Sequence, residues 1–231
     1  MQPVLSALNI FPLKSCAPLA LDVAAVEPRG LRHDRRWVVT DETGRFLTGR
    51  QHPRLTLLRC IPDGDALVVS TPGMPPLRLV PPAGGERIDV TVWTNTVAAL
   101  PLGFTADAWI SLFLGMPARI AYMDEACVRP VNPDYARPDD EVSFADAFPL
   151  LLISQGALDA LNAKLATPVP MLRLRPNLVS QTRPRTRKTV GNACASVRSK
   201  SISSSHARVA WSRRSTSSAA SSTRAASRCA R

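Results

Sequence analysis

Residues 30–55 read GLRHDRRWVVTDETGRFLTGRQHPRL, and their pattern decides the expected fold. The run RRWVVTD (35–41) is short and β-branched, and it leads into the turn signal DETG (41–44). Runs of the same kind, separated by Gly, Pro and Asp, lie on both sides of it: VLSALNIFPL (4–13), LDVAAVE (21–27), LTLLRC (55–60), ALVVS (66–70), PLRLV (76–80) and RIDVTVW (87–93). Closely spaced short strands favour a barrel or curled sheet over alternating α/β units, so the prediction is a mainly β fold.

The pattern changes after about residue 103. TADAWISLFLG (105–115) predicts a helix that ends at its glycine, with three apolar residues on one face: Trp109, Leu112 and Phe113. SQGALDALNAKL (154–165) predicts a second helix with Ser154 as N-cap and an apolar stripe of Ala157, Leu158, Leu161 and Leu165. The strand-like run ARIAYM (118–123) lies between them. We therefore expect a second module of the α+β class, beginning near residues 100–125.

Composition narrows the class of protein. The chain has 231 residues, 45% of them hydrophobic, which is enough for one large or two small domains. No run of eighteen or more apolar residues occurs and the N-terminus lacks a basic region, so neither a membrane span nor a secretory signal is expected. Five cysteines are scattered, odd in number and without metal spacing. They favour a reducing compartment, and we expect a cytoplasmic protein.

The net charge of +11 comes from one end of the chain. Residues 1–179 contain 17 Lys and Arg against 18 Asp and Glu, whereas residues 180–231 contain the other 12 basic residues and no acid. The serine-rich end has few large apolar residues, so it is expected to be a disordered basic tail. Such a tail attracts nucleic acid at low salt without reading sequence, but its single aromatic residue gives no stacking platform.

Two basic stretches are candidate anion sites. Lys14 and Ser15 follow an apolar strand, where a lysine and a hydroxyl can hold a phosphate; a solvated strand end is the alternative. Four arginines lie within eight residues before the next β run: Arg29, Arg32, Arg35 and Arg36. Guanidinium groups recognise phosphate with two parallel hydrogen bonds, which suits a polyanionic ligand. Surface ion pairs with Asp34 or Glu27 are the alternative for these four.

A third stretch, RLRPNLV (173–179), places Arg173, Arg175 and Asn177 before another β run, and Pro176 excludes a helix there. His33, His52 and His206 are isolated, so none is assigned as a metal ligand. Sequence motifs for a nucleophile elbow, a phosphate-binding loop, a dinucleotide fold or a redox dithiol are absent. No catalytic residue is assigned.

Four stretches together resemble the MOSC family in its two-module form, an N-terminal β-barrel module followed by the MOSC domain. They are FPLKSC (11–16), residues 30–55, FADAFPLLLISQGALDALNAKL (144–165) and RLRPNLV (173–179), in family order and spacing across residues 1–179. The resemblance implies a molybdenum–pterin cofactor, with Lys14, Ser15 and Arg35 near its phosphate and pterin. It adds Arg175 and Asn177 from the RPN motif. Ala147 and Phe148 depart from it, because some relatives carry hydroxyl residues there.

The resemblance implies three segments. Residues 1–100 would be the N-terminal β-barrel module, 101–179 a truncated MOSC β-barrel domain, and 180–231 the disordered basic tail. The family continues after RPN with a segment whose cysteine thiolate binds molybdenum, and this chain lacks it. Shifting the reading frame of degenerate codons for the tail permits DGWKRLRIGEVEVDLVKPCARCVVTTVD, which resembles the missing segment. We therefore predict a frameshift near Val179 or Ser180, and no metal ligand in this chain.

The expected function follows from the same resemblance. It implies a molybdenum-cofactor oxidoreductase that reduces N-hydroxylated or N-oxide-type substrates when intact, with this chain inactive. A cofactor or sulfur carrier of the same family is the alternative, and a nucleic-acid-binding protein acting through the tail is a weaker one. The implied partners are a small-molecule substrate and an unidentified electron donor, with no membrane and no specific nucleic acid. Pyridoxal phosphate binding is a further expectation at family level.

Overall fold

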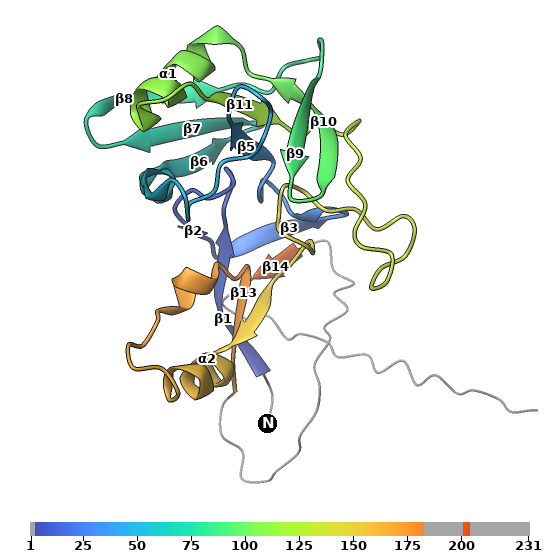
Figure 1. Cartoon of the computed structure of the whole chain (residues 1–231). Helices are drawn as coiled ribbons and strands as arrows, with labels where there is room; N and C mark the ends of the chain where they lie inside the picture. The colour runs from blue at the N-terminus through green and yellow to red at the C-terminus, as the bar shows by residue number, and fades with distance from the viewer. Residues whose placement is uncertain (1–2, 183–200, 204–231) are drawn as a thin grey trace, which may run out of the picture.

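The structure is a computed structural model that describes residues 3–182 and 201–203 (Figure 1). Its strands are short and belong to several small sheets that curl around one another. The strands are β1 Pro3–Ile10, β2 Leu19–Ala20, β3 Val23–Glu27, β4 Gly30–Leu31, β5 Trp37–Thr40, β6 Arg59–Asp63, β7 Ala66–Thr71, β8 Met74–Leu79, β9 Ile88–Val92, β10 Asn95–Pro101, β11 Arg119–Tyr122, β12 Leu152–Ser154, β13 Leu178–Thr182 and β14 Ser201–Ser203. The helices are α1 Phe104–Leu114 and α2 Gln155–Asn162, with 3-10 turns at Pro53–Leu57 and Met171–Leu174. The prediction of a mainly β fold is confirmed.

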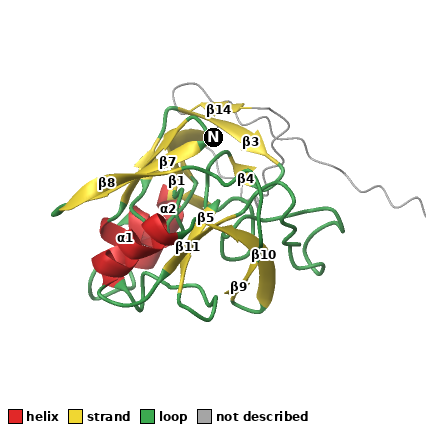
Figure 2. Cartoon of the chain, turned by 90° about the horizontal axis from the view of Figure 1, so that it is seen from above, coloured by secondary structure: helices red, strands yellow, loops and turns green. Residues whose placement is uncertain are grey.

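The upper part of Figure 1 contains a sheet in the order β5-β11-β10-β9 and a meander β6-β7-β8. All four residues of β5 are buried, because the strand is covered on both faces. One face meets a core that includes Phe11, Trp37 and Leu55, together with the buried side of α1. Seen from above in Figure 2, β8 and the β9–β10 hairpin extend on opposite sides of this part.

The lower part of Figure 1 is a sheet in the order β12-β13-β1-β2, with α2 beside it. β13 is antiparallel to β1 and parallel to β12, so the first described strand pairs with residues about 175 positions later, as in the pair Pro3 and Thr182. A small core lies between this sheet and β3 and contains Leu8, Ile10 and Leu178. The segment that leaves β1 at Ile10 then runs into the upper core, so the two parts share one continuous chain at their junction.

Gly30 allows a close approach at this junction. Its φ is +122°, and a Cβ built there would lie 2.5 Å from the carbonyl oxygen of Pro149. Only glycine adopts this conformation without strain and without a clash. The turn that begins the Arg-rich stretch is thereby packed directly against the loop that precedes β12.

Both helices form where the sequence predicted them, but the residues that they bury differ from the prediction. The Ser154 hydroxyl accepts a hydrogen bond from the Ala157 amide, and Gly115 ends α1 in a left-handed conformation. Leu112, predicted on the buried face of α1, is 74% exposed, because the buried face consists of Ala106, Trp109, Ile110 and Phe113. The stripe predicted on α2 buries only Leu158. Leu161 is exposed although it lies inside the helix, and Leu165 lies beyond the helix end at Asn162 and is also exposed.

Of three further expectations, two differ from the structure and one stays a prediction. The predicted strand at 55–60 is wrong, because Pro53 begins a 3-10 turn and β6 starts only at Arg59. Irregular chain was expected beyond residue 180, but the end of β13 and the three residues of β14 are strands; β14 pairs with β3. The rest of the predicted tail lies outside the described residues. The boundary at residue 100 stays a prediction, although α1 packs against β8 and β11 pairs with β5.

Candidate functional site

The site is built where residues 11–16 lie beside residues 34–37. The Phe11 amide donates to the Asp34 carboxylate at 2.8 Å, and the Arg35 amide donates to the Phe11 carbonyl at 3.0 Å. The Lys14 amide then donates to the Trp37 carbonyl at 2.8 Å. This pairing converts the end of a sheet strand into a short, buried arm that presents Lys14 and Ser15.

Arg35 and Asn177 form the centre of the site. Arg35 Nη1 donates to Asn177 Oδ1 at 3.2 Å and to the neighbouring Asp34 carboxylate, and Nη2 donates to the Arg175 carbonyl at 3.1 Å. Asn177 is 1% exposed, and its oxygen also accepts from the Leu151 amide while its nitrogen donates to the Asn9 carbonyl. Four separate segments of the chain are therefore tied together by these two side chains.

Arg175 stacks on the same aromatic ring as Arg35. The guanidinium carbon of Arg175 lies 4.1 Å from the centre of the Phe11 ring, and that of Arg35 lies 4.6 Å from it. Arg175 Nη1 donates to the Cys16 carbonyl at 2.8 Å, whereas its Nη2 is buried with no hydrogen-bond partner. Burial lowers the pKa of Arg175, and the Arg35 charge also lowers it. A buried donor without an acceptor beside a second cation is a suitable contact for an anionic group.

Lys14 lies beside this pair and is almost fully buried. Its Nζ donates to the Phe144 carbonyl at 2.6 Å and to Asp146 Oδ1 at 2.8 Å, and it faces the Phe46 ring at 5.1 Å. Burial lowers the pKa of Lys14 from 10.5 to about 8, against the opposing effect of Asp146, and the Arg35 charge adds to the lowering. Although burial raises the pKa of Asp146, Lys14 holds it below its ordinary value.

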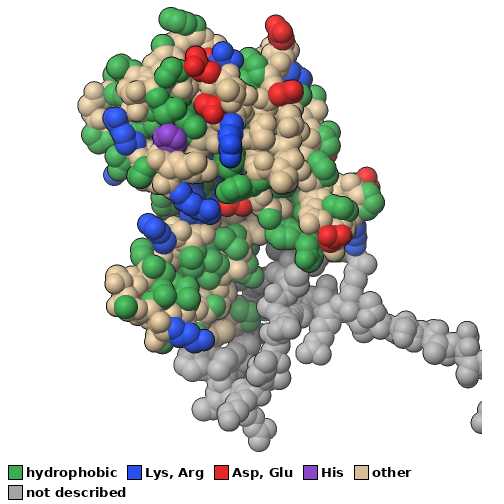
Figure 3. All heavy atoms as spheres, viewed as in Figure 1, with side chains coloured by type: hydrophobic (Ala, Val, Ile, Leu, Met, Phe, Trp, Pro, Cys, Tyr) green, Lys and Arg blue, Asp and Glu red, His purple; other side chains and the backbone are tan. Residues whose placement is uncertain are grey.

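The Ser15 hydroxyl is able to donate a hydrogen bond to a ligand. Its Oγ accepts a hydrogen bond from the Gly49 amide at 3.0 Å, which leaves the hydroxyl proton free to donate. The side chain is half-buried, next to the loop that follows Leu47. The structure thus brings all five predicted residues to one junction, but by different contacts: Lys14, Ser15 and Arg175 keep donors to spare, while Arg35 and Asn177 are held mainly by protein atoms. Figure 3 shows Lys and Arg side chains gathered where the upper and lower parts meet.

Three of these five residues have left-handed backbone conformations. φ is 73° at Ser15, 51° at Arg35 and 55° at Arg175, and only His33 and Trp93 share this property among the non-glycine residues that the structure describes. Such a conformation costs about 1–3 kcal/mol and is concentrated at binding and catalytic sites. Arg175 also precedes a proline, which normally favours extended backbone. The local strain therefore marks the same junction that the side-chain contacts define.

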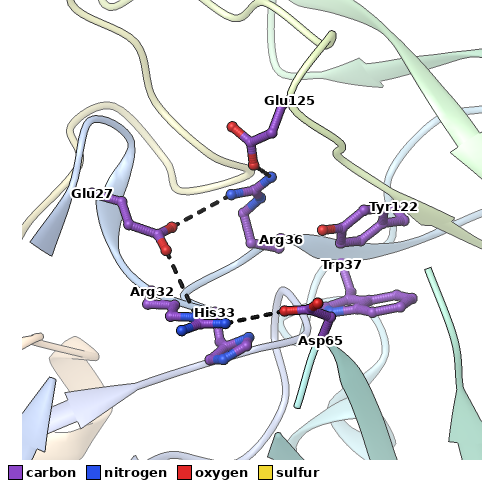
Figure 4. Close-up of a pocket in the computed structure, with 8 residues that line it drawn as sticks. All are labelled: Glu27, Arg32, His33, Arg36, Trp37, Asp65, Tyr122 and Glu125. Carbon is purple, nitrogen blue, oxygen red and sulfur yellow. Dashed lines mark hydrogen bonds and ion pairs between the residues drawn. The ribbon is translucent and has the colours of Figure 1, made fainter. Parts of the chain in front are cut away.

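The other arginines of the 29–36 stretch have acidic partners. Arg29 pairs with Glu141 at 2.6 Å, and Arg36 pairs with Glu125 at 2.6 Å. Arg32 lies within 3.1 Å of Asp65 and 3.9 Å of Glu27. Figure 4 shows Arg32 and Arg36 around a small polar cavity of about 120 Å³. Of the ion pairs named as the alternative, those with Glu27 form at Arg32, at 3.9 Å, and at Arg36, at 3.6 Å. Arg35 forms the one with Asp34 while it also contacts Asn177, whereas Arg29 pairs with Glu141 instead.

Four residues that organise the site were not assigned to it from the sequence, although Asp34 was considered as an ion-pair partner. Asp34 and Phe11 organise the arginines, and Asp146 accepts from Lys14. Arg129 is 2% exposed and donates to the Ser143 carbonyl at 2.7 Å and the Asp146 carbonyl at 3.2 Å, which holds the loop that carries Asp146. No spacing pattern links Arg129 or Asp146 to Lys14, since both lie more than a hundred positions from it.

The positions that depart from the family pattern lie at the edge of the site. Ala147 and Phe148 are both exposed, and the Phe148 ring contacts Tyr135 edge-on, with centroids 6.2 Å apart. Within residues 3–182 and 201–203, no group of three or more His, Cys, Asp or Glu side chains is arranged to hold a metal ion. No helix in this described part is long and apolar enough to cross a membrane.

Comparison with known proteins gives a consistent result. The family model for the MOSC N-terminal beta barrel domain matches residues 2–117. Mitochondrial amidoxime-reducing component 1 of Mus musculus is 33% identical over 182 residues, 74% of this chain and 54% of the relative. The Homo sapiens protein of that name is 32% identical over 183 residues, with the same two coverages. Molybdenum cofactor sulfurase of Homo sapiens is 30% identical over 122 residues, 51% of this chain and 14% of the relative.

The chain spans about half the length of the amidoxime-reducing components that it matches. The matched domain covers residues 2–117 and includes three of the five predicted site residues, Lys14, Ser15 and Arg35. The resemblance read from the motifs is thereby confirmed at the level of the family. The chain belongs to the family of proteins that carry the MOSC N-terminal beta barrel domain.

Proposed function

We propose that the junction around Phe11 binds the phosphate and pterin of a molybdenum cofactor. The observation that carries this proposal is the buried Nη2 of Arg175, a charged donor with no partner, beside Lys14 and the free hydroxyl proton of Ser15. These three donors come from two segments 160 residues apart that the fold brings together. One relative, molybdenum cofactor sulfurase of Homo sapiens, has a name that refers to this cofactor, which supports this choice of anion.

Each residue has a definite task in this proposal. Arg175 and Lys14 supply positive charge, and Ser15 donates a hydrogen bond, so together they neutralise and orient a phosphate. Arg35 positions Arg175 by donating a hydrogen bond to the Arg175 backbone carbonyl, and it adds a second charge above the Phe11 ring. Asn177 holds the strand entry of β13 against residues 9 and 151, which keeps Arg175 facing the junction.

The cofactor, when bound, supplies the two-electron chemistry that removes an oxygen atom from an N-hydroxylated or N-oxide-type substrate, with electrons from a separate donor. The protein's part is to hold the anionic group and to exclude water around it with Phe11 and the buried arm. This activity belongs to the intact form. We infer that the chain as given retains anion binding but no turnover, because it lacks the segment in which the family carries its metal-binding thiolate.

The test compares two arginines that lie two positions apart. Arg175→Gln removes the unpartnered donor, whereas Arg173→Gln changes an exposed arginine of the same motif. We expect Arg175→Gln to weaken binding of a pterin phosphate by about tenfold or more, because a charge-assisted hydrogen bond contributes about 1.5–3 kcal/mol. Arg173→Gln should bind like the parent chain. Titration calorimetry at fixed salt measures both affinities, and urea unfolding of each variant checks that it is folded.

Equal affinity in the parent and in Arg175→Gln would contradict the proposal. Arg175→Lys separates charge from geometry, since lysine keeps the charge without the planar fork. We expect Arg175→Lys to recover only part of the affinity. Full recovery would show that the site detects net charge and has no specific geometry for phosphate.

A second candidate is cofactor or sulfur carriage, which the similarity to the human molybdenum cofactor sulfurase favours. It shares the anion site and differs in what happens after binding. A carrier should release the intact cofactor to an acceptor enzyme, whereas a reductase should retain it through repeated substrate reduction. Measuring cofactor transfer to an apo-enzyme, beside amidoxime reduction, separates the two for the frame-restored chain.

A further inference from the structure

A cavity of about 430 Å³ lies next to the proposed cofactor site. Its wall includes Phe46, Thr48, Arg50, Thr91 and Trp93, and none of its lining residues is acidic. The loop that supplies Thr48 and Arg50 also contains Gly49, whose amide binds Ser15. Phe46 has Lys14 on its ring at 5.1 Å. The cavity and the anion site therefore share a wall, although the residues proposed to hold the cofactor do not line the cavity.

Trp93 occupies a position that normally excludes a large side chain. It is the first residue of the two-residue connection between β9 and β10, and its φ is 54°. Hairpins of this length favour Asn, Asp or Gly where φ is positive. The indole is nevertheless 47% exposed, so its burial in a core does not offset the backbone strain. Backbone strain at a residue whose aromatic ring is exposed is typical of a binding position.

The neighbours of Trp93 fix the orientation of its ring. The indole Nε1 donates to Asp146 Oδ1 at 3.3 Å, and the Phe46 ring meets the indole nearly edge-on, with centroids 5.0 Å apart. Asp146 is the carboxylate that pairs with Lys14. The ring is therefore held from two sides by residues of the cofactor junction, and its position is tied to theirs.

Arg50 gives the cavity its charge. Its guanidinium carbon lies 5.8 Å from the centre of the Trp93 ring, and within residues 3–182 and 201–203 it makes no ion pair with an acid. Arg29, Arg32 and Arg36 differ from Arg50, since all three are paired with acids. None of the lining residues is acidic, although the Asp146 carboxylate contacts the indole from outside the lining. A cation above an indole in such a cavity attracts an anion that also carries a flat group.

We propose that this cavity binds an aromatic anion, with its flat ring against Trp93 and its negative group at Arg50. The inference deepens the proposed function, because it assigns the substrate side of the same junction, and its identity as a substrate pocket rests on that function. Binding itself does not, since Trp93 and Arg50 make no contact with Arg175. Substrates with a conjugated ring and a negative or oxygen-rich group are thereby favoured over aliphatic amines.

The experiment compares three probes by titration calorimetry at fixed ionic strength: phenyl phosphate, inorganic phosphate and phenol. We expect phenyl phosphate to bind about tenfold more tightly than inorganic phosphate, because stacking on the indole adds to the attraction of the cation. Phenol should bind more weakly than either. If phenyl phosphate binds no better than inorganic phosphate, the assignment of the ring to Trp93 is wrong.

Two variants locate the binding. Trp93→Asn removes the ring but tolerates left-handed backbone, so it should reduce phenyl phosphate affinity to that of inorganic phosphate. Its unfolding midpoint in urea should be unchanged or higher, because strain is relieved; a purely structural tryptophan would lower the midpoint. Arg50→Gln should weaken phenyl phosphate binding by about tenfold. Arg54→Gln, an exposed arginine that stacks on Phe113 outside the cavity, should have no effect.

The two proposals fail separately. Loss of pterin phosphate binding in Arg175→Gln, with phenyl phosphate affinity unchanged in Trp93→Asn and Arg50→Gln, would overturn the cavity assignment alone. The reverse pattern would overturn the cofactor site and leave the aromatic anion pocket in place.

Discussion

Lys14 should lower the stability of the folded chain at neutral pH. Burial lowers its pKa from 10.5 to about 8, even though Asp146 lies 2.8 Å from its Nζ. Each unit of pKa corresponds to about 1.4 kcal/mol, so the buried charge costs about 3 kcal/mol at pH 7. In Lys14→Met this cost disappears. Asp146 loses its partner but is 66% exposed and stays hydrated. The Phe144 carbonyl loses a hydrogen bond, which offsets about 1 kcal/mol.

We therefore expect Lys14→Met to be about 2 kcal/mol more stable than the parent at pH 7, while phosphate binding is lost. The pH dependence gives the sharper test. Because the folded pKa lies below the unfolded one, the unfolded chain binds more protons between about pH 8 and 10.5, and stability rises with pH across this window. Cysteine and tyrosine groups with raised pKa values act in the opposite direction there, so the difference between parent and variant isolates Lys14.

The assay is urea unfolding followed by tryptophan fluorescence at several pH values from 7 to 10. Lys164→Met is the matched control, because Lys164 is the other lysine in the described residues and is exposed. Its stability should stay within about 0.5 kcal/mol of the parent at every pH. The reasoning is refuted if Lys14→Met and the parent show the same dependence of unfolding free energy on pH, or if the variant is several kcal/mol less stable.

The remaining predictions concern the junction and the reading frame. Gly30→Ala should lose about 2–3 kcal/mol, because its Cβ would meet the Pro149 carbonyl and φ is positive, whereas Gly73→Ala, with positive φ and open space, should lose only about 1 kcal/mol. Thermal unfolding of the two variants measures the difference; equal losses would show that the contact with Pro149 is unimportant. Sequencing the coding DNA around codon 179 tests the predicted frameshift, which an intact frame would contradict. Restoring the frame should recover molybdenum and reductase activity, measured as metal per chain and turnover, whereas stoichiometric molybdenum in the present chain would contradict this.

The strained backbone and the buried charges of the junction have a common consequence. Ser15, Arg35 and Arg175 are left-handed, and Lys14 is charged in a poorly hydrated place. Each of these features opposes folding, so each has to be offset by packing elsewhere, such as the Trp37 and Phe11 core. A chain with these features is expected to gain stability when an anion binds, because the ligand contacts the same cations that folding has to bury.

Local order was readable from the sequence. Strands such as β7 and β9, the Ser154 cap and the Gly115 stop depend on residues close together in the chain, and these were confirmed. The predictions from sequence were wrong where tertiary packing determines which residues are buried. Leu112 has the hydrophobicity of a core residue, but α1 faces the upper core with another side, and no local signal indicates which side will be covered.

For the site, too, the sequence predicted one part and the tertiary structure determined the other. The motifs named Lys14, Ser15, Arg35, Arg175 and Asn177 through their resemblance to a family, and a sequence alone supports that much. Tertiary structure decided which cations keep a donor for a ligand, because Asp146 and the Arg175 carbonyl come from segments far from Lys14 and Arg35. The unpartnered Arg175 Nη2 and the exposed ring of Trp93 are likewise results of folding. Burial and hydrogen bonding depend on contacts between residues more than a hundred positions apart, and a pattern of nearby residues contains no information about them.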